Sequence, residues 1–487
     1  MSGSGEFEAT IGLEVHVQLK TRSKLFCGCG NEFGAPPNTL TCPVCLGLPG
    51  ALPVLNREAL KLGLKAAAAL KCRIPDTVSF DRKNYFYPDL PKGFQISQHF
   101  GAVGVEGEVE YWSEDGFGVI PVERVHLEED TAKAVHAEAY VRADETLLDF
   151  NRAGVPLMEV VSKPAITSSA QARRYVVALR RMLVEVGVSD CDLEKGAFRI
   201  DTNISVKRVG REALGEQVEI KNLNSLKAME AALEYEFERQ VGIVEAGGEV
   251  TRVTLHYDDA TGRTVPTRVK EVRADYRYFA EPDLPPVALP ASYIKEIEAE
   301  VEEIARPAAV IQELFVGYKT TLAEAEMVAF TPGYYDFLKA ASAAYGGERR
   351  ALVNWLVGDV TRELKERGME LGESELTPGA LAALLELLDA GEANVPAARE
   401  VLAALMSEGG EPAAIMSAKG LGQISDAAAI EELVREAAAA NPKAVADVRG
   451  GKQKARRALV GYVMKKTGGR ANPKVVDESI TKILAEP

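Results

Sequence analysis

Alternating apolar and polar positions characterise much of the first half of the chain. In segment 11–20 every odd position is apolar and every even position is polar or glycine. This period of two is typical of a strand that buries one face, and it would place Glu14 and His16 together on the other face. Segments 199–206 and 217–221 repeat the pattern. An antiparallel sheet with one solvated side explains such strands, but acids, His, Asn and Lys on the polar faces also suit chemistry.

Helical periodicity replaces this alternation after a proline-rich boundary at 283–290. Before the boundary, segments such as 57–70 and 168–186 have a helical pattern, whereas Ala-, Glu- and Leu-rich helical segments dominate beyond it. The Gly- and Pro-containing stretch 408–412 then interrupts them like a hinge. The helical segments expected between the boundary and the hinge are 292–304, 308–316, 334–344, 350–366, 377–389 and 394–406.

These two patterns predict three domains in an α+β chain. We expect an antiparallel-sheet domain at 1–292, an α-helical domain at 293–407 and a small α-helical tail domain at 408–487. A chain of 487 residues exceeds what one hydrophobic core usually supports, which agrees with several domains.

Composition limits where the protein works. No run approaches the ~18 consecutive apolar residues of a membrane span, and the N-terminus, with Glu6 and Glu8, has neither a basic signal region nor an Arg-rich transit pattern. The six cysteines are too sparse for a disulfide scaffold in so long a chain. We therefore expect a cytoplasmic protein that has no membrane partner.

The C-terminal end is basic although the whole chain is acidic. The net charge of −15 argues against nucleic-acid binding by the whole surface. Residues 451–487, however, hold nine Lys or Arg against three acids. A solvated helical surface and a nucleic-acid contact both fit this local charge.

Four of the cysteines form a pattern of their own. They follow the spacing Cys-x-Cys, twelve residues, then Cys-x-x-Cys, at Cys27, Cys29, Cys42 and Cys45. Four thiolates in two close pairs suit a tetrahedral structural zinc site that leaves no open position for catalysis. The alternative is a set of four buried structural cysteines.

Acidic residues and histidines recur in three separate segments. They are Glu14 with His16, the run 126–130 (His-Leu-Glu-Glu-Asp), and Glu159. Carboxylates with imidazole suit a hard divalent cation such as Mg²⁺ or Mn²⁺ that bridges substrate phosphates. Spacing alone does not show that the segments converge, and each acid taken singly also fits an exposed surface.

Segment 81–98 combines aromatic residues, lysines and amides around turn residues, and 275–279 repeats the aromatic pattern. Such a segment suits the stacking of a base and the neutralisation of phosphate, although a buried loop anchored by its aromatic residues is the simpler interpretation. The chain contains no phosphate-binding P-loop, no dinucleotide fingerprint and no G-x-S-x-G elbow. A nucleophile loop of the amidase kind is also missing, so glutamine hydrolysis by this chain itself is not expected.

Six ordered motifs follow one another in the first part of the chain. They are IGLEVH at 11–16, DRKNYFYPD at 81–89, HLEED at 126–130, NRAGVPL at 151–157, IKNLNS at 220–225, and DYRYF at 275–279 with EPDLPP at 281–286. Together they closely resemble the B subunit family of the aspartyl/glutamyl-tRNA amidotransferases. Asn354-Trp355-Leu356 and the basic tail extend the resemblance over nearly the whole chain.

The resemblance implies an ATP-dependent, glutamine-hydrolysing amidotransferase, a carbon–nitrogen ligase. ATP would activate the side-chain carboxylate of Glu-tRNA(Gln) and/or Asp-tRNA(Asn) as an acyl phosphate, which ammonia then converts to the amide. The ammonia would come from a partner A subunit of amidase fold, and a small C subunit would complete the heterotrimer. In this family the sheet domain is cradle-like and catalytic, and the tail domain grips tRNA.

The resemblance also implies roles for individual residues. Catalysis and Mg²⁺ binding are expected of Glu14, His16, Glu129 and Glu159, with Glu128 as a neighbouring ligand. Lys83 is expected to be catalytic, and the residues expected to contact phosphate or substrate are Arg82, Lys83, Lys221 and Asn222. The implied cofactors are ATP, Mg²⁺ and a structural Zn²⁺.

One departure from the family pattern concerns Glu194-Lys195-Gly196, where the family commonly has a second acid in the middle position. Arg199-Ile200-Asp201 likewise stands where Arg-Cys-Asp is common. A function of another class stays open: a zinc-stapled, tRNA-binding scaffold that only delivers substrate to catalytic partners. Both functions require tRNA binding, but only the enzyme requires the acidic residues.

Overall fold

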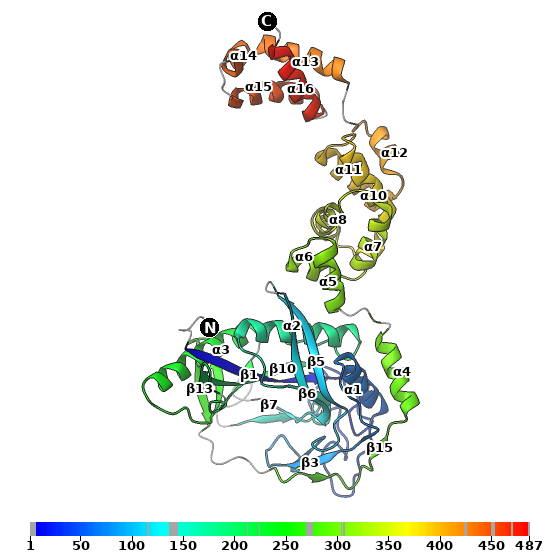
Figure 1. The fold of residues 1–487 in the computed structure, drawn as a ribbon. Coiled ribbons are helices and arrows are strands. Elements are labelled where there is room, and N and C mark those ends of the chain that lie inside the picture. The colour runs from blue at the N-terminus through cyan, green and yellow to red at the C-terminus, as the bar shows by residue number, and fades with distance from the viewer. Residues whose placement is uncertain are drawn as a thin grey trace. The chain divides into compact units, whose positions relative to one another are not determined.

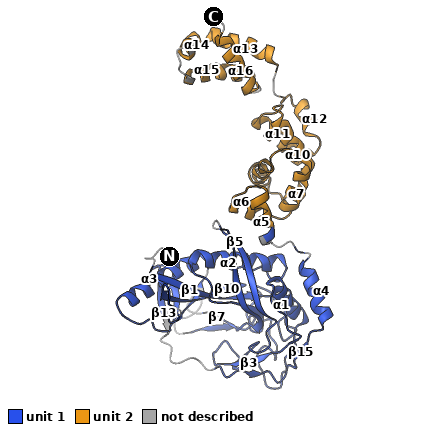
Figure 2. Ribbon diagram, viewed as in Figure 1, with its two compact units in different colours: residues 1–309 blue, residues 310–487 orange. Residues whose placement is uncertain are grey.

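The computed structural model divides into two compact units, residues 1–309 and 310–487 (Figure 2). Each unit is described by itself. The described residues are 6–485, except 114–115, 136–144, 212, 224, 269–275, 303, 305–306, 423–425, 450–452 and 469–470.

Unit 1 is built on strands, with a few long helices. Its strands are β1 (Phe7–Gln18), β2 (Thr77–Val78), β3 (Asp81–Asn84), β4 (Phe94–Ser97), β5 (Gly104–Ser113), β6 (Gly116–Glu129), β7 (Lys133–Val135), β8 (Leu147–Asp149), β9 (Pro156–Ser162), β10 (Phe198–Arg208), β11 (Val218–Leu223), β12 (Thr254–Asp258), β13 (Arg263–Arg268), β14 (Phe279–Ala280) and β15 (Val287–Ala288). Its helices are α1 (Arg57–Ala69), α2 (Ser169–Glu185), α3 (Leu226–Glu245) and α4 (Ala291–Glu302).

An eight-stranded sheet organises unit 1, in the order β13-β12-β11-β10-β1-β9-β6-β5. Every neighbouring pair is antiparallel except β11 and β12, which are parallel. Strand β1 lies near the middle of the sheet, between β10 and β9. The predicted α+β class with a largely antiparallel sheet is confirmed.

The two faces of the sheet have different environments. On β1, buried positions alternate with half-buried ones, and Ile11, Leu13 and Val15 are at most 1% exposed. Their side chains belong to the core that α1, α2 and α3 cover (Figure 1). Side-chain caps begin these helices, because Asn56, Ser168 and Ser225 accept hydrogen bonds from backbone N–H groups of the first turns. The other face therefore keeps the polar side chains of β1 and its neighbours.

Helix α4 belongs to unit 1. The expected domain boundary at residue 292 falls inside this helix, but Ile297 and Val301 are buried in the core of unit 1. Glu300 also forms an ion pair of 2.8 Å with Lys61 of α1. The division between the compact units accordingly lies at residue 309.

A three-stranded sheet, β14-β3-β4, adjoins the end of β6. The Gln95 side chain of β4 donates to the backbone oxygen of Glu129 over 2.7 Å, and the side-chain oxygen of Gln98 accepts from the backbone N–H of Leu127 over 2.8 Å. These bonds bring β3, the partner of β4, close to the polar ends of the central strands. The cysteine-containing loop fills the stretch between β1 and α1.

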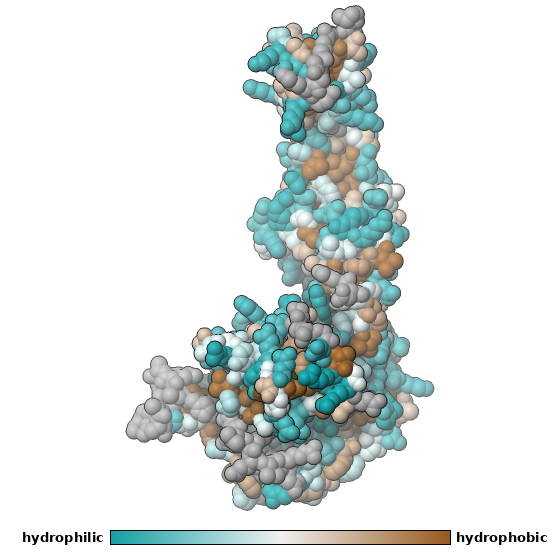
Figure 3. Space-filling model, turned by 60° about the vertical axis from the view of Figure 1, so that its left-hand side comes forward, coloured by the Kyte–Doolittle hydropathy of each residue, from teal (hydrophilic) through white to brown (hydrophobic). Residues whose placement is uncertain are grey.

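Unit 2 is helical, as predicted. Hydrophilic side chains cover much of the face in Figure 3, and hydrophobic ones form separate patches. No helix within the described ranges is long and apolar enough to cross a membrane. The helices are α5 (Pro307–Gly317), which begins at the end of unit 1, α6 (Leu322–Phe330), α7 (Tyr334–Ala344), α8 (Arg349–Asn354), a π-helix (Trp355–Val360), α9 (Thr361–Arg367), α10 (Pro378–Asp389), α11 (Val395–Glu408), α12 (Pro412–Ala418), α13 (Ala427–Ala440), α14 (Pro442–Arg449), α15 (Arg456–Lys466) and α16 (Pro473–Ala485), with 3₁₀ turns at Leu371–Glu373 and Gln453–Ala455.

The last helices of unit 2 have a core of their own. Ile430, Val434, Leu459 and Ile480 are fully buried in one cluster formed by α13, α15 and α16. Helix α12, which follows the expected hinge at 408, contacts α10 and α11 instead.

Candidate active site

The side chains of His16, Glu128 and Glu159 converge on the polar face of the central sheet. Strand β9 lies between β1 and β6, and the strand register places Glu159 directly opposite His16 on one side and His126 on the other. Opposite residues of an antiparallel pair point to the same face. The Nε2 atom of His16 lies 3.7 Å from Oε1 of Glu128 and 3.6 Å from Oε2 of Glu159. Glu128 and Glu159 are almost completely buried.

The spacing of these three groups suits a small cation. One ligand atom from each of His16, Glu128 and Glu159 lies within 4.8 Å of the others. Separations of 3.6 and 3.7 Å exceed a good hydrogen bond. Ligands at about 2.1 Å from an octahedral Mg²⁺ lie about 3.0 Å apart when adjacent and about 4.2 Å apart when opposite. The donor set of one imidazole and two carboxylates therefore fits a hard divalent ion.

His126 belongs to the run 126–130 that the sequence analysis named, but it was given no role of its own there. Its Nε2 lies 3.0 Å from Oε2 of Glu159 and 3.9 Å from Oε2 of Glu128. Burial alone would lower the pKa of His126, but the two carboxylates outweigh it and raise the pKa to about 9. The histidines in turn help to hold the pKa of Glu159 and of Glu128 below the usual range, against the effect of burial. Alternation along β6 was the signal for His126, since residues 126 and 128 share a face.

The structure does not bring Glu129 to the other predicted ligands. Glu129 lies two residues after Leu127 on β6, so the two side chains point to the same face of the strand. Leu127 packs against Gly63 of α1. The Glu129 carboxylate accepts a hydrogen bond of 2.8 Å from the backbone N–H of Ile96 and forms an ion pair with Lys92. Consecutive glutamates of β6 therefore serve opposite faces of the strand.

Glu14 lies on the same face of β1 as His16, beside the three converging residues. Asn203 of β10 donates a hydrogen bond of 3.1 Å to its Oε1. Burial, and then the charge of Glu159, raise the pKa of Glu14 above its ordinary value. A carboxyl with a raised pKa is a better proton acceptor near neutral pH than an exposed one.

Lys83 of β3 faces the same site from the smaller sheet. Its Nζ lies 5.0 Å from the ring centre of Tyr276 and 5.9 Å from that of Tyr85. Burial lowers the pKa of Lys83, but the charge of Glu128, followed by Tyr278 and Glu159, outweighs burial and raises it. Lys83 therefore stays cationic beside the carboxylates.

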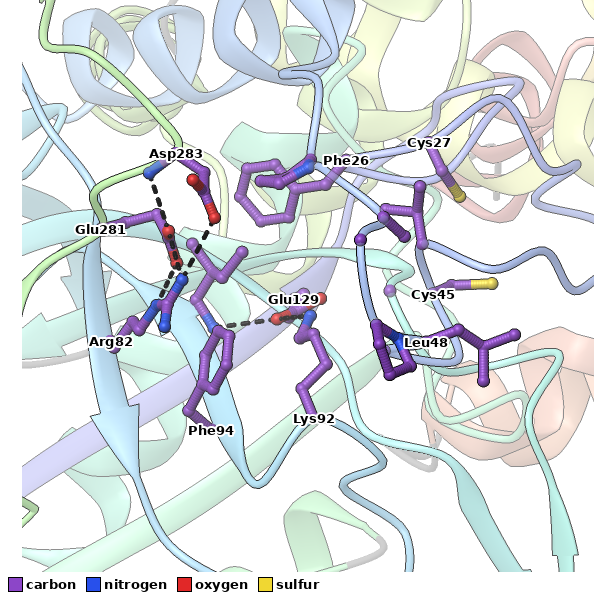
Figure 4. A pocket seen from close by; sticks show the side chains of 18 residues that line it. Phe26, Cys27, Cys45, Leu48, Arg82, Lys92, Phe94, Glu129, Glu281 and Asp283 are labelled. Carbon is purple, nitrogen blue, oxygen red and sulfur yellow. Dashed lines mark hydrogen bonds and ion pairs between the residues drawn. The ribbon is translucent and has the colours of Figure 1, made fainter.

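Arg82, its neighbour, points to a different set of partners. Its guanidinium donates hydrogen bonds of 2.7 and 2.8 Å to the two carboxylate oxygens of Glu281, and one of 3.3 Å to Asp283 (Figure 4). It also lies 4.1 Å from the ring centre of Phe94. Glu281 is buried, and its carboxylate binds the Arg82 guanidinium in a bidentate pair. The guanidinium that was expected to contact phosphate is therefore already engaged within the protein.

Lys221 lies farther along the polar face, on β11. Its Nζ is 3.0 Å from Oε1 of Glu219 and 3.4 Å from Oδ2 of Asp201. Burial would lower the pKa of Lys221, but the charges of Asp201 and Glu219 outweigh the effect of burial and raise this pKa. The side chain of Asn222 lies outside the described part of the chain.

The four cysteines form one cluster, as their spacing predicted. One Sγ from each of Cys27, Cys29, Cys42 and Cys45 lies within 4.8 Å of the others, and Sγ of Cys42 and Cys45 are 3.9 Å apart. Tetrahedral zinc with bonds of about 2.3 Å would space its sulfurs about 3.8 Å apart. A hydrogen bond from Cys27 lowers the pKa of the Cys45 thiol to about 4, whereas the same hydrogen bond, and then burial, raise the pKa of Cys27, so the negative charge of this pair rests on Cys45. The cluster therefore fits a metal such as zinc.

A pocket of about 330 Å³ separates the cysteine loop from the smaller sheet (Figure 4). Cys27 and Cys45 line one side, and Arg82, Lys92 and Glu129 line another. The charged groups of this pocket are already paired with one another, whereas His16 lies 3.7 Å from Glu128 and 3.6 Å from Glu159.

Comparison with known proteins connects this site to a family. Residues 9–295 match the family model of the GatB/GatE catalytic domain, and residues 336–484 match that of the GatB domain. The chain belongs to the GatB family. The converging side chains of β1, β6 and β9 all lie within the match to the GatB/GatE catalytic domain.

Curated relatives in the GatB family match over nearly their full length. A protein of Moorella thermoacetica is 44% identical over 479 residues, covering 98% of this chain and 100% of the relative. One of Thermus thermophilus is 45% identical over 480 residues, covering 98% and 99%. One of Carboxydothermus hydrogenoformans is 42% identical over 481 residues, covering 99% of each. Each is named as the B subunit of an aspartyl/glutamyl-tRNA(Asn/Gln) amidotransferase.

Proposed function

We propose that this chain is the subunit of a tRNA-dependent amidotransferase that activates and amidates the side-chain carboxylate of Glu-tRNA(Gln) and/or Asp-tRNA(Asn). One observation carries the proposal: His16, Glu128 and Glu159 converge on the polar face of a GatB catalytic domain, with Lys83 beside them. This arrangement suits phosphate chemistry, which a scaffold that only delivers tRNA would not need.

The reaction requires ATP because a carboxylate is a poor acyl donor. A carboxylate oxygen of the substrate attacks the γ-phosphorus of ATP, ADP leaves, and an acyl phosphate forms. Ammonia then attacks the acyl carbon, inorganic phosphate leaves, and the nitrogen loses a proton to give the amide. When bound by His16, Glu128 and Glu159, Mg²⁺ would neutralise charge that develops on the phosphate oxygens.

The side chains around the three ligands have distinct parts in this proposal. Lys83, kept cationic by its carboxylate neighbours, neutralises the transferred phosphate or the substrate carboxylate. Glu14, whose pKa is raised, accepts the proton that ammonium must lose before it attacks. Lys221 with Asp201 and Glu219 lines the polar face along which the ammonia arrives. Arg82 and Glu129 hold the neighbouring loops in place.

The partners in this proposal follow from what the chain lacks. With no amidase-type nucleophile loop in the sequence, ammonia comes from glutamine hydrolysed in an A subunit, and a small C subunit completes a heterotrimer. The cysteine cluster binds a structural Zn²⁺. The proposal also includes a cytoplasmic location.

The decisive experiment compares Glu159→Gln with Glu123→Gln in the reconstituted complex. Glu123 is an exposed residue of β6, the strand next to β9 in the sheet, and it precedes Glu128 by five residues. We expect Glu159→Gln to reduce amidation from ammonium by at least about 100-fold and to weaken Mn²⁺ binding, measured by electron paramagnetic resonance. Glu123→Gln should change neither, and both variants should bind tRNA normally. Normal amidation by Glu159→Gln would support the scaffold function instead.

The tail domain contributes tRNA binding in this proposal. Lys454, Arg457, Lys465 and Lys474 are exposed there, whereas Lys482 is paired with Glu431 at 2.5 Å. Replacing Arg457 and Lys465 by Gln should weaken tRNA binding and reduce its salt dependence by about one unit of slope per lost phosphate contact. Lys482→Gln serves as the matched control. An unchanged slope in the double variant would contradict a tRNA contact by this surface.

A further inference from the structure

One lysine of the cysteine loop is completely buried. Lys24 has a relative exposure of 0% and is among the largest fully buried side chains within the described ranges. Lysine almost never occurs in this state unless an anion accompanies it, because an unpaired buried ammonium carries a large desolvation penalty. Among the residues that the structure describes, no carboxylate lies within ion-pair distance of Lys24. The anion must therefore be of another kind.

One partner of the Lys24 ammonium is a sulfur, and another is a neutral backbone oxygen. Nζ of Lys24 lies 3.6 Å from Sγ of Cys45 and 3.2 Å from the backbone oxygen of Phe150. Cys45 is itself buried. The contact therefore joins a buried ammonium group to a member of the cysteine cluster.

Lys24 contacts both cysteine pairs. Its N–H donates to the oxygen of Cys29 over 3.0 Å, so the residue holds the first pair through its main chain and the second through its side chain. The loop between the pairs is fixed to the same region, since Asn151 accepts from the N–H of Leu40 over 2.7 Å. Lys24 thus lies where the two halves of the cluster meet.

The stem of Lys24 lies beside Gly154 and the second cysteine pair. A Cβ at Gly154, which adopts a φ of +85°, would lie 3.4 Å from Cβ of Cys45 and 3.5 Å from Cδ of Lys24. The stem is thus next to the segment that leads to β9. Because the whole side chain is buried, its ammonium points to the interior partners and not to solvent.

We infer that Lys24 is the counter-charge of the zinc site, a positioning residue whose ammonium donates a hydrogen bond to the Cys45 thiolate. This inference rests on the proposed zinc occupancy. Zn²⁺ with four thiolates has a net charge of −2, and burying it requires compensating donors from the surrounding protein. Lys24 supplies one such donor together with a positive charge, and therefore stabilises the loaded loop.

The test compares full-length Lys24→Met with wild type and with Lys20→Met. Lys20 is exposed, pairs with Asp190 over 2.7 Å and provides the same substitution four residues away. Zinc affinity is measured by competition with a chromophoric chelator. We expect Lys24→Met to weaken it about 10- to 100-fold, and Lys20→Met to leave it unchanged. The sulfur-to-metal charge-transfer band of the Co²⁺-loaded Lys24→Met protein should move to lower energy, because the thiolate has lost a donor.

Thermal unfolding with and without a chelator separates this role from simple packing. The Lys24→Met protein should lose more stability when loaded than when empty, because the zinc site with four thiolates carries the larger negative charge, whereas a packing role would lower the stability of both forms equally and would overturn the inference. Unchanged zinc affinity and an unmoved Co²⁺ band would overturn it as well. If Lys24→Met does not fold, Lys24→Gln replaces it, with a smaller loss of affinity expected. Failure of the wild type to bind Zn²⁺ or Co²⁺ would refute the zinc site itself.

Discussion

Arg82 provides a prediction that separates a structural role from a substrate-binding one. We expect Arg82→Met to destabilise unit 1 by about 3 kcal/mol and to leave the KM for ATP unchanged. The guanidinium makes two short hydrogen bonds to Glu281, whose side chain is only 1% exposed. Removing one partner of a buried ion pair costs about 3–5 kcal/mol because the other charge stays buried. Arg82 itself is 22% exposed, so we take the lower end of this range.

The two tryptophans of the chain make this measurement specific. Trp112 lies in unit 1 and Trp355 in unit 2. In a Trp355→Phe background, urea unfolding followed by fluorescence reports on unit 1 through Trp112 alone. Glu281→Gln should cause a loss similar to that of Arg82→Met. The double variant should lose clearly less than the sum of the single variants, because the two residues share one interaction.

The opposite pattern would refute the reasoning. If Arg82→Met left the urea midpoint unchanged and raised the KM for ATP, the guanidinium would bind substrate, as the sequence suggested. Strict additivity of the two substitutions would also contradict the pair. Arg73→Met is a matched control, because Arg73 and its partner Glu106 are both about two-thirds exposed, at 65% and 66%, and exposed pairs contribute little.

Three further predictions concern single sites. Tyr175→Phe should raise the stability of unit 1 by about 1 kcal/mol in the same urea assay, since the buried hydroxyl has no hydrogen-bond partner within the described residues; a loss would indicate a bound water. Gly47→Ala should cost at least about 1–2 kcal/mol, because φ is +65° and the new Cβ would lie 2.5 Å from Cγ of Lys92; an unchanged midpoint would contradict this. Glu324 has its pKa lowered by a hydrogen bond from Arg350, so its contribution is present above the ordinary pKa of 4.5 and is lost as pH falls through the lower folded value. Glu324→Gln should therefore reduce thermal stability by about 1 kcal/mol at neutral pH and by much less in acid, and a constant difference would be contrary evidence.

Local periodicity was sufficient for strands β1, β10 and β11 and for helices α1 and α2 of unit 1. The alternation of 11–20 gave β1 and the shared face of Glu14 and His16, because a half-buried strand imposes period two on its own sequence. Helices α1 and α2 likewise match the predicted segments within one residue at each end. The spacing of the four cysteines predicted their cluster, since metal ligands in tight turns are close in sequence.

Helix α6 was missed in unit 2. It has only nine residues, too few for its apolar period to emerge from an Ala- and Glu-rich context. Its capping box was the available signal, since Thr321 and Glu324 bond reciprocally across the first turn. The caps of short helices are more informative than their periodicity.

The sequence predicted the types of residue in the candidate site, but it predicted only in part which individual residues belong to it. Glu128 and Glu129 are adjacent in sequence, so a search for acids cannot separate them, whereas strand parity does. Arg82 and Glu281 are 199 residues apart, and no local pattern reveals that they pair. Long-range partners decide whether a conspicuous charge is available to a substrate.

The alternation of side chains between the two faces of β6 also limits how the length of this segment can vary. Within 126–129 a single inserted or deleted codon would exchange the faces of Glu128 and Glu129, placing one carboxylate of the proposed ion site in the pocket beside the cysteine loop. A substitution of Glu128 or Glu129 would remove only the contacts of that residue. A single-residue insertion or deletion that keeps the reading frame would instead remove both the ion ligand and the ion pair with Lys92. Comparisons of natural variants should therefore show substitutions in this segment but no gaps.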